Sequence, residues 1–336
     1  MALRRARSLT GNSRLAKVRL ARKTLLGSRT AFNRAPILRD NLYRAPVRNI
    51  AGGGPFASYL PRAHRLFEHI VESSVMPVPT SINYGQVASG YDKSRCVEPG
   101  IADAMVAGLR SLHAQSVLEI GAGTGNYTGA LTEHGLSVVA LDRSPAMIEI
   151  GADKTSAHWI LSDASSIPLR TRSVDAIVAV NALHHLSDLP AALAEFRRVA
   201  RVGAVLQAVV RENLETLWYR HYFPEIDDVL LPLHPTLGSL ITAMFQAGFS
   251  RVAVAKIFYS GRGDLTFEAA RTQPRLLFDP AFRASTSGFR RPAAAGIARG
   301  LAVLERDLDS GAFARIAATF DLAHAAAADC VLITAR

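Results

Sequence analysis

The chain has 336 residues but only two cysteines, Cys96 and Cys330. Two cysteines cannot form a disulfide framework, and their spacing matches no metal-binding motif, so the composition favours a reducing compartment. The chain also has no uninterrupted run of about 18 apolar residues, which argues against a membrane-spanning helix. Hydrophobic residues nevertheless make up 49% of the sequence, enough for a packed core. We expect a cytoplasmic protein without a membrane span or a metal site.

Acidic residues are almost absent from the first 50 positions, which contain 13 lysines and arginines and a single acid, Asp40. This segment has a formal charge of +12, whereas residues 51–336 have a formal charge of −1. Three interpretations stay open: a solvated, disordered extension, a transit peptide that would direct the chain to the mitochondrial matrix, or a segment that binds polyanions such as RNA or acidic lipid. The arginines follow no clean helical period, which counts against a transit peptide.

A glycine-rich run separates this basic segment from the rest of the chain. The sequence Ala51-Gly52-Gly53-Gly54-Pro55 is typical of a turn or a linker. We therefore predict a basic N-terminal extension with its linker over residues 1–55, and one globular domain over residues 56–336.

Beyond the linker, apolar runs alternate with segments of helical pattern. Helices are predicted over 62–75 and 100–112, and a longer helical stretch over 264–327. Runs typical of strands are Ser116–Ile120, Ser137–Leu141, His158–Leu161, Ala176–Val180, Ala204–Val209, Arg251–Phe258 and Cys330–Thr334. Strands that alternate with helices form a parallel sheet covered on both faces, so the sequence predicts an α/β protein.

The most informative segment runs from Val117 to Asn126 and reads Val-Leu-Glu-Ile-Gly-Ala-Gly-Thr-Gly-Asn. A buried strand leads into a glycine-rich turn, and a helix is expected from Tyr127, so the backbone can approach a ligand closely. A dinucleotide fingerprint beginning at Gly121 would require glycine at position 126, and no Gly-Lys-Ser/Thr follows as it would in a P-loop. The order is instead acid-x-Gly-x-Gly-x-Gly, beginning at Glu119.

Acidic residues accompany the following strands. Asp142 ends the run Ser137–Leu141, where a carboxylate can accept hydrogen bonds from both hydroxyls of a ribose or can cap a helix starting near Ser144. The glycine turn upstream favours the ribose role. Asp163 follows the third strand and could accept a hydrogen bond from an adenine amino group. Asp175 opens the fourth strand, and we interpret it as structural.

With these features the sequence resembles the class I S-adenosylmethionine-dependent methyltransferases, in particular the group similar to ubiquinone and menaquinone biosynthesis enzymes, which acts mostly on small molecules. The family's N-terminal lid, first motif, ribose motif, adenine motif and the stretch after the fourth strand correspond to Tyr84–Arg95, Val117–Gly125, Leu141–Met147, Ser162–Ala164 and Asn181–Leu186. One segment departs from the pattern: Arg201-Val202-Gly203 stands where the family commonly has Pro-Gly-Gly before the fifth strand.

The resemblance implies a Rossmann-like sheet of seven strands, mostly parallel with an antiparallel last strand, and a helical insertion on the substrate side. It implies S-adenosylmethionine as the cofactor, a lid over residues 80–95, a cofactor-binding core over 100–210 and an acceptor-side region over 211–327. The residues that would bind the cofactor are Tyr84, Tyr91, Glu119, Gly121, Ala122, Gly123, Gly125, Asp142, Arg143, Met147, Asp163, Ala164 and Asn181.

The implied reaction is methyl transfer by in-line displacement, in which positioning of the nucleophile dominates. A base is needed only if the acceptor atom loses a proton, and His184, His185 and the lid residue Tyr91 are the candidates. The two histidines could instead satisfy polar groups beside the pocket.

We expect a small-molecule acceptor that is methylated at oxygen, nitrogen or carbon. The basic extension over 1–50 leaves an RNA or protein methyltransferase as an alternative, and a non-catalytic assembly factor that retains the fold is a second one. The balanced charge of residues 51–336 argues against an extended face for nucleic acid. The aromatic run Trp218–Phe223 is typical of a core, and Arg271 and Arg275 are typical of a surface. The sequence does not indicate an oligomeric state.

Overall fold

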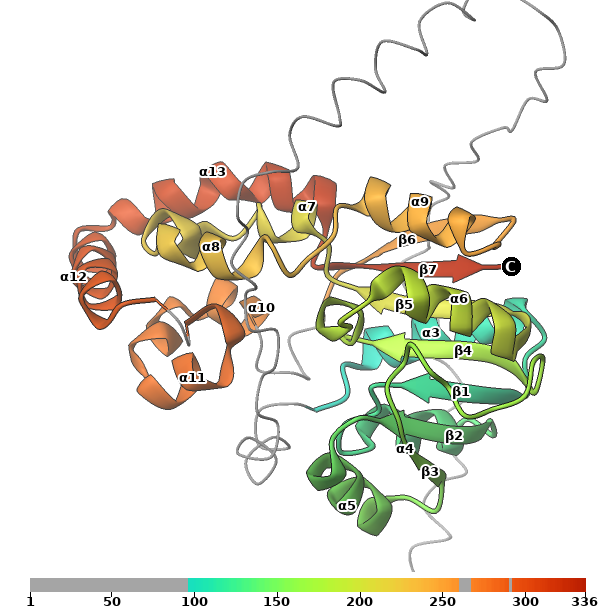
Figure 1. The fold of residues 1–336 in the computed structure, drawn as a ribbon. Coiled ribbons are helices and arrows are strands. Elements are labelled where there is room, and N and C mark those ends of the chain that lie inside the picture. Colours follow the sequence, from blue (N-terminus) through green and yellow to red (C-terminus); the bar gives the residue numbers. More distant parts are fainter. Residues whose placement is uncertain (1–95, 260–266, 290–291) are drawn as a thin grey trace, which may run out of the picture. The chain divides into compact units, whose positions relative to one another are not determined.

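The described residues form a seven-stranded sheet with helices around it (Figure 1). The structure is a computed structural model, and it describes residues 96–259, 267–289 and 292–336. The strand order is β3-β2-β1-β4-β5-β7-β6. The strands are β1 (Ser116–Ile120), β2 (Ser137–Asp142), β3 (His158–Leu161), β4 (Val174–Val180), β5 (Ala200–Ala208), β6 (Val252–Ile257) and β7 (Cys330–Ala335).

The pairing of the strands confirms the predicted Rossmann-like sheet. β1 pairs in parallel with β2 and β4, and the pairs β2–β3 and β4–β5 are also parallel. β7 runs antiparallel to both of its neighbours, β5 and β6. β5 begins at Ala200, four residues before the predicted run Ala204–Val209. β4 begins at Val174, which puts Asp175 at its start as predicted, and the register between β4 and β5 shifts between Val174 and Ala176.

The segment that departs from the family pattern, Arg201–Gly203, lies inside β5 near its amino end. A side chain at position 203 would collide with β7, because an added Cβ would lie 1.9 Å from the carbonyl oxygen of Ala335. The glycine is therefore required by the close approach of the C-terminal strand, at the sheet edge opposite the carboxyl ends of the parallel strands.

Helices cover both faces of the sheet. α3 (Pro99–Ser111) and α4 (Asn126–Glu133) pack on one face, and α6 (Leu189–Val199) and α9 (Leu237–Gln246) pack on the other. Side chains alternate along a strand, so β4 contributes Val178 and Val180 to the first core and Ile177 and Ala179 to the second. Alternation of this kind gives the sheet two apolar faces, as the sequence predicted for a sheet buried on both sides.

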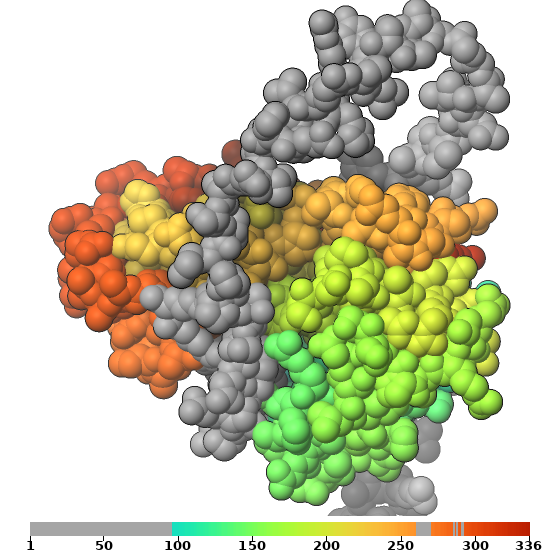
Figure 2. Space-filling model, viewed as in Figure 1, coloured from blue at the N-terminus to red at the C-terminus, as the bar shows by residue number. Residues whose placement is uncertain are grey.

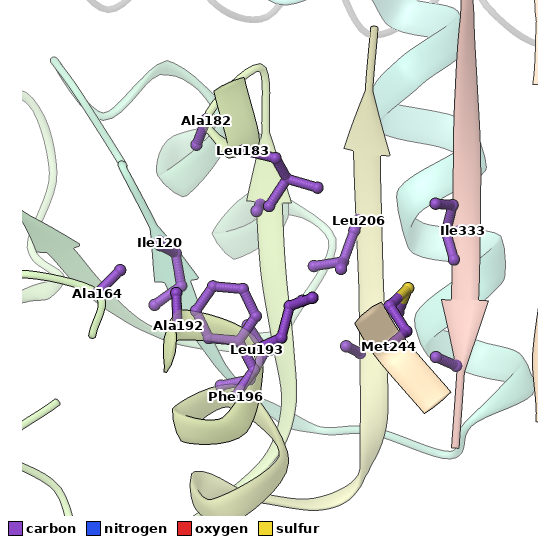
Figure 3. Packing of buried hydrophobic residues seen from close by; sticks show 14 of the residues in the cluster. Ile120, Ala164, Ala182, Leu183, Ala192, Leu193, Phe196, Leu206, Met244 and Ile333 are labelled. Atoms are coloured by element: carbon purple, nitrogen blue, oxygen red, sulfur yellow. The ribbon is translucent and has the colours of Figure 1, made fainter. Parts of the chain in front are cut away.

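α6 shows how local sequence sets a helix and its buried face. The helix begins after Asp188, whose side chain accepts a hydrogen bond from the backbone N–H of Ala191 at 2.9 Å. Leu193 and Phe196 point from α6 into the core that Met244 of α9 also enters (Figure 3). Full burial of a side chain of this size contributes about 1.5–3 kcal/mol. In the space-filling view α6 and α9 lie side by side over the sheet (Figure 2).

The stretch between β5 and β7 is mostly helical, which confirms the predicted insertion. Its helices other than α9 include α7 (Arg211–Leu214), α8 (Asp227–Leu230), α10 (Phe267–Thr272), α11 (Pro280–Ser285), α12 (Ala294–Ser310) and α13 (Ala312–Ala327). They pack around a core of their own that contains Trp218, Tyr219 and Phe223, so the aromatic run is a core element as predicted. Arg275 is exposed, as predicted, and lies 3.5 Å from Asp309. Although α9 and β6 belong to the same stretch of sequence, they pack with the sheet.

Some predictions concern residues that the structure does not describe. The helix over 62–75, the lid over 80–95 with Tyr84 and Tyr91, and the domain boundary after residue 55 lie outside the described residues. Within the described residues, no helix is long and apolar enough to cross a membrane.

Candidate functional site

The carboxyl ends of β1, β2, β3 and β4 meet at one edge of the sheet. Two backbone hydrogen bonds attach the loops after β1 and β3 to the end of β2: Ala122 N–H donates to the carbonyl of Leu141 at 3.0 Å, and Ser162 N–H donates to the carbonyl of Asp142 at 3.1 Å. The strand order reverses between β1 and β4. In open α/β sheets, ligands bind in the crevice at this reversal, so the motif residues predicted from the sequence gather where a ligand site is expected.

The glycine-rich turn after β1 has a conformation that side chains disfavour. Gly121, Gly123 and Gly125 have φ angles of 65°, 57° and 80°. A Cβ added at Gly121 would lie 2.8 Å from the Cβ of Ala182, in the loop after β4. Glycine at this position therefore lets the two loops on either side of the reversal approach each other, and α4 begins directly afterwards at Asn126.

Asp142 is held by the turn that it faces. Its Oδ2 accepts a hydrogen bond from Gly123 N–H, and its Oδ1 accepts one from Ser144 N–H, both at 2.8 Å. α5 (Pro145–Lys154) follows, and the side chain of Ser144 makes no capping hydrogen bond to it. The two backbone donors fix the orientation of the carboxylate, whose oxygens retain further lone pairs for a ligand.

A cavity opens at this edge of the sheet, with a volume of about 670 Å³ that includes space open to solvent. It is lined by Ile120, Gly121, Gly123, Leu141, Asp142, Arg143, Met147, Ser162, Asp163, Ala164, Val180, Asn181, Ala182, His185 and Leu186. Nine of these lining residues are among the predicted site residues: Gly121, Gly123, Asp142, Arg143, Met147, Asp163, Ala164, Asn181 and His185. Apart from Tyr84 and Tyr91, the remaining predicted residues are not part of this lining: Glu119, Ala122 and His184 lie next to lining residues in the sequence, and Gly125 lies two residues after Gly123.

Glu119 is buried behind the cavity wall. Only 2% of its surface is exposed, and its Oε2 accepts a hydrogen bond from the hydroxyl of Thr128 at 2.5 Å. Burial raises the pKa of Glu119 from 4.5 to about 7; the bond from Thr128 opposes this shift and the charge of Asp142 adds to it. The carboxyl group therefore links β1 to α4, and it changes charge near neutral pH.

Asp163 stays ionised in the loop after β3. Its Oδ1 accepts hydrogen bonds from the hydroxyl of Ser165 at 2.6 Å and from the backbone N–H of Ser165 at 2.9 Å. These two bonds lower its pKa; partial burial opposes them, and the nearby charge of Arg143 adds to them. The cavity thus has two acidic positions, at the ends of two adjacent strands.

Histidine rings form a stack beside the cavity. The rings of His184 and His185 have centroids 3.9 Å apart, and the ring of His184 stacks on His234 at 4.4 Å with an interplanar angle of 20°. Nδ1 of His234 lies 2.8 Å from the carbonyl oxygen of Leu230. Since a carbonyl only accepts, Nδ1 carries the proton. Burial lowers the pKa of His234; the bond to Leu230 opposes this, and the charge of Arg211 adds to it.

Sequence reasoning missed His234 because the residue is about 50 positions from His184, in a loop without a motif. It also missed Ser162, Ala182 and Leu186 as lining residues, although each belongs to a segment that the family resemblance had marked.

Asp175 has the structural role predicted for it. Its Oδ2 accepts hydrogen bonds from Gln115 N–H and from Ser116 N–H and hydroxyl, all at 2.9 Å, and Arg201 donates to its Oδ1 at 3.0 Å. Partial burial raises its pKa, but these hydrogen bonds outweigh it and bring the pKa to about 2. These contacts lie at the amino ends of β1 and β4, at the opposite edge from the cavity.

Known proteins are similar to this chain. Residues 118–207 match a family model described as a methyltransferase domain. A malonyl-acyl carrier protein O-methyltransferase of Serratia marcescens is 32% identical over 125 residues, and an uncharacterized methyltransferase of Mycobacterium tuberculosis is 35% identical over 142 residues. The chain spans about half the length of these two relatives, 49% and 57%, and the matches cover 37% and 42% of this chain.

Two further matches extend over most of the other protein. An uncharacterized methyltransferase of Bacillus velezensis is 30% identical over 186 residues, which are 50% of this chain and 79% of that protein. The crystal structure of a protein described as a methyltransferase from an antibiotic biosynthesis pathway of Anabaena variabilis has a TM-score of 0.61 and 26% identity, covering 71% of this chain and 98% of that one. With the sheet order and the glycine turn, these matches establish that the chain belongs to the class I S-adenosylmethionine-dependent methyltransferases.

Proposed function

We propose that this chain transfers the methyl group of S-adenosylmethionine to oxygen, nitrogen or carbon of a small-molecule acceptor. The observation that carries the proposal is the cavity at the carboxyl edge of the sheet, whose wall combines the glycine turn with Asp142 and Asp163. Its volume lies within the range of about 300–1,000 Å³ that is usual for small-molecule sites.

The residues around the cavity fit the cofactor of the family. Asp142 would accept hydrogen bonds from the ribose hydroxyls, because its carboxylate is oriented on the cavity wall by two backbone donors. The apolar side chains of Met147 and Ala164 would contact the adenine, with Asp163 near its amino group. Gly121 lets the loop after β1 lie against the loop after β4, since a Cβ there would meet Ala182, and both loops line the part of the cavity where the methionine part would lie.

When bound, S-adenosylmethionine supplies a methyl group on a positively charged sulfur, which is already strongly electrophilic. The residues of the chain would hold the acceptor atom in line with the bond between the methyl group and sulfur. Positioning of this kind can lower the activation barrier of the transfer by about 7–11 kcal/mol. Asn181 and Leu186 line the wall on the side of β4, where they would limit how an acceptor approaches. A ring nitrogen of His185 could take a proton from an acceptor that carries one, and His184 would hold the His185 ring from behind.

Two observations favour a small molecule over RNA. Residues 51–336 have a formal charge of −1, so the +12 of residues 1–50 is confined to one end of the sequence. Nucleic-acid sites of enzymes usually present basic residues around the site itself. One relative is named as an O-methyltransferase of malonyl-acyl carrier protein, which agrees with an oxygen acceptor.

Methyl transfer into fractionated extracts tests the proposal. The full chain is incubated with S-adenosylmethionine labelled in its methyl group and with separate small-molecule, RNA and protein fractions, and the Asp142→Ala variant provides the background. We expect enzyme-dependent label in the small-molecule fraction. Label in RNA alone, or on the amino-acid side chains of proteins alone, would overturn the small-molecule acceptor; cofactor binding without any transfer would favour a non-catalytic assembly factor.

A further inference from the structure

Gln207 is a polar residue in an apolar position. It lies near the end of β5, where its register partners are Val180 of β4 and Leu332 of β7. Both partners belong to the core beneath α3, as do Val205 two residues earlier and Cys330. The Gln207 side chain is fully buried, with 0% of its surface exposed. A buried amide costs free energy unless it is hydrogen-bonded, so the contacts of this side chain indicate what it does.

The amide oxygen of Gln207 binds the first residue beyond β4. Oε1 accepts a hydrogen bond from the backbone N–H of Asn181 at 2.7 Å. Strand β4 ends at Val180, so this N–H has left the sheet and needs another acceptor. Asn181 has a φ angle of 50°, in the left-handed region, which asparagine tolerates better than most residues but which still costs free energy. The side chain on β5 thus stabilises a strained turn at the end of the neighbouring strand.

This turn shapes the cavity wall. Asn181, Ala182 and His185 all line the cavity, and the short 3-10 helix Leu183–His185 begins within two residues of Asn181. The Cβ of Ala182 lies so close to Gly121 that any larger residue at position 121 would collide with it. A change in the backbone at position 181 would therefore move the wall that faces the glycine turn. Gln207 itself is absent from the cavity lining, so its effect on a ligand would be transmitted through Asn181.

We propose that Gln207 is a positioning residue: its hydrogen bond to Asn181 holds the left-handed turn after β4, and thereby the part of the cavity wall formed by residues 181–186, in the shape that binds the cofactor. The inference rests on the proposed function, because it assigns the same cavity to the same ligand. It requires an acceptor oxygen at the distance that a glutamine side chain reaches. A hydrophobic residue would fill the space without accepting the bond, and asparagine would be one methylene too short.

Four variants separate positioning from general packing. Gln207→Met keeps the length without the acceptor, Gln207→Asn keeps the amide but shortens its reach, and Gln207→Glu keeps an acceptor oxygen at the same distance. Cys330→Ala is the matched control, because the buried Cys330 thiol also interacts with the Gln207 side chain but makes no hydrogen bond to the Asn181 N–H, which Gln207 Oε1 accepts. Each full-length variant is titrated with S-adenosylhomocysteine by calorimetry, and amide hydrogen exchange is measured over residues 180–186.

We expect the Met and Asn variants to bind S-adenosylhomocysteine about tenfold more weakly or worse. Their amides at residues 181–186 should exchange faster than the same amides of the wild type, while the strands exchange as in the wild type. Gln207→Glu should recover most of the affinity, and Cys330→Ala should bind like the wild type. If wild-type chain does not bind the probe, the proposed function fails. If it binds, and either the Met or the Asn variant is folded and matches it in affinity and in exchange, the positioning role is wrong. A loss shared equally by Cys330→Ala would also contradict it.

Discussion

At the scale of the residue, Asp142 accepts hydrogen bonds from two backbone N–H groups, and we propose that it also accepts them from the ribose of the cofactor. Replacing it with alanine removes a charged acceptor from the cavity wall, so we expect affinity for S-adenosylhomocysteine to fall roughly 10- to 150-fold, corresponding to about 1.5–3 kcal/mol. Calorimetry on the full chain measures this. Asp175→Ala is the control, because Asp175 also accepts backbone hydrogen bonds but does so at the amino end of the sheet. Asp175→Ala should lower the stability of the chain and leave its affinity for S-adenosylhomocysteine unchanged. If Asp142→Ala binds S-adenosylhomocysteine as tightly as the wild type does, Asp142 does not bind the ribose.

Glu119 predicts a dependence of stability on pH. Its pKa is about 7 in the folded chain against 4.5 ordinarily, so the folded state binds the proton more tightly than the unfolded state. Stability should therefore fall as pH rises from about 4.5 to about 7, by at most about 3 kcal/mol, and stay low above that range. Glu119→Gln keeps an acceptor for Thr128 and has no such titration.

Urea unfolding at pH 5 and pH 8, without ligand, measures the difference between wild type and Glu119→Gln. We expect the variant to gain stability relative to the wild type at the higher pH. Glu149→Gln, at an exposed position on α5, should follow the wild type at both values. Parallel pH dependence in wild type and Glu119→Gln would show that burial of Glu119 does not shift its pKa in this way.

At the scale of the element, the turn after β1 can be tested against a turn of similar conformation. Gly121 and Gly135 both have positive φ, 65° and 85°, but an added Cβ would meet Ala182 at 2.8 Å in the first case and open space in the second. Alanine at either position strains the backbone by about 1–2 kcal/mol. We expect Gly121→Ala to abolish binding of S-adenosylhomocysteine and Gly135→Ala to retain it. Thermal unfolding checks that both are folded, and retained binding by Gly121→Ala would show that this turn does not form the cofactor site.

Elements also show what sequence can and cannot predict. The starts of β1, β2 and β3 were predicted to the residue, because apolar runs bounded by turn residues mark buried strands. The start of β5 was predicted four residues too late, since Arg201 and Gly203 interrupt its apolar run and the register shift at this point depends on pairing with β4. The strand order came from the family resemblance, because apolar runs alone do not specify which strands are neighbours.

The same distinction holds for the site. Residues within contiguous motifs were found because each motif has a local signal: Asp142 was predicted from its place at the end of a strand, and Asn181 from the family resemblance. His234 and Gln207 were not found, since their contacts are made by rings and amides from distant segments, and a lone histidine in a loop or a lone glutamine in a strand has no local signal.

At the scale of the whole molecule, the sequence joins a strongly basic segment to a nearly neutral remainder, +12 against −1. Whole-chain charge would favour nucleic acid as a partner, whereas the cavity and its acidic residues favour a cofactor with a ribose and a cationic sulfur. The two are compatible, because the excess of basic residues is concentrated in the first 50 positions of the sequence, whereas the described residues that line the cavity include Asp142 and Asp163.

Calorimetric titration of the full-length chain with S-adenosylhomocysteine, with NAD⁺ titrated in parallel, tests the central claim most directly. The glycine turn has asparagine where the dinucleotide fingerprint needs its third glycine, and its acid at the end of β2 lies on the cavity wall. The account predicts saturable one-to-one binding of S-adenosylhomocysteine and no binding of NAD⁺. Binding of NAD⁺ without binding of S-adenosylhomocysteine, by a chain shown to be folded, would contradict it.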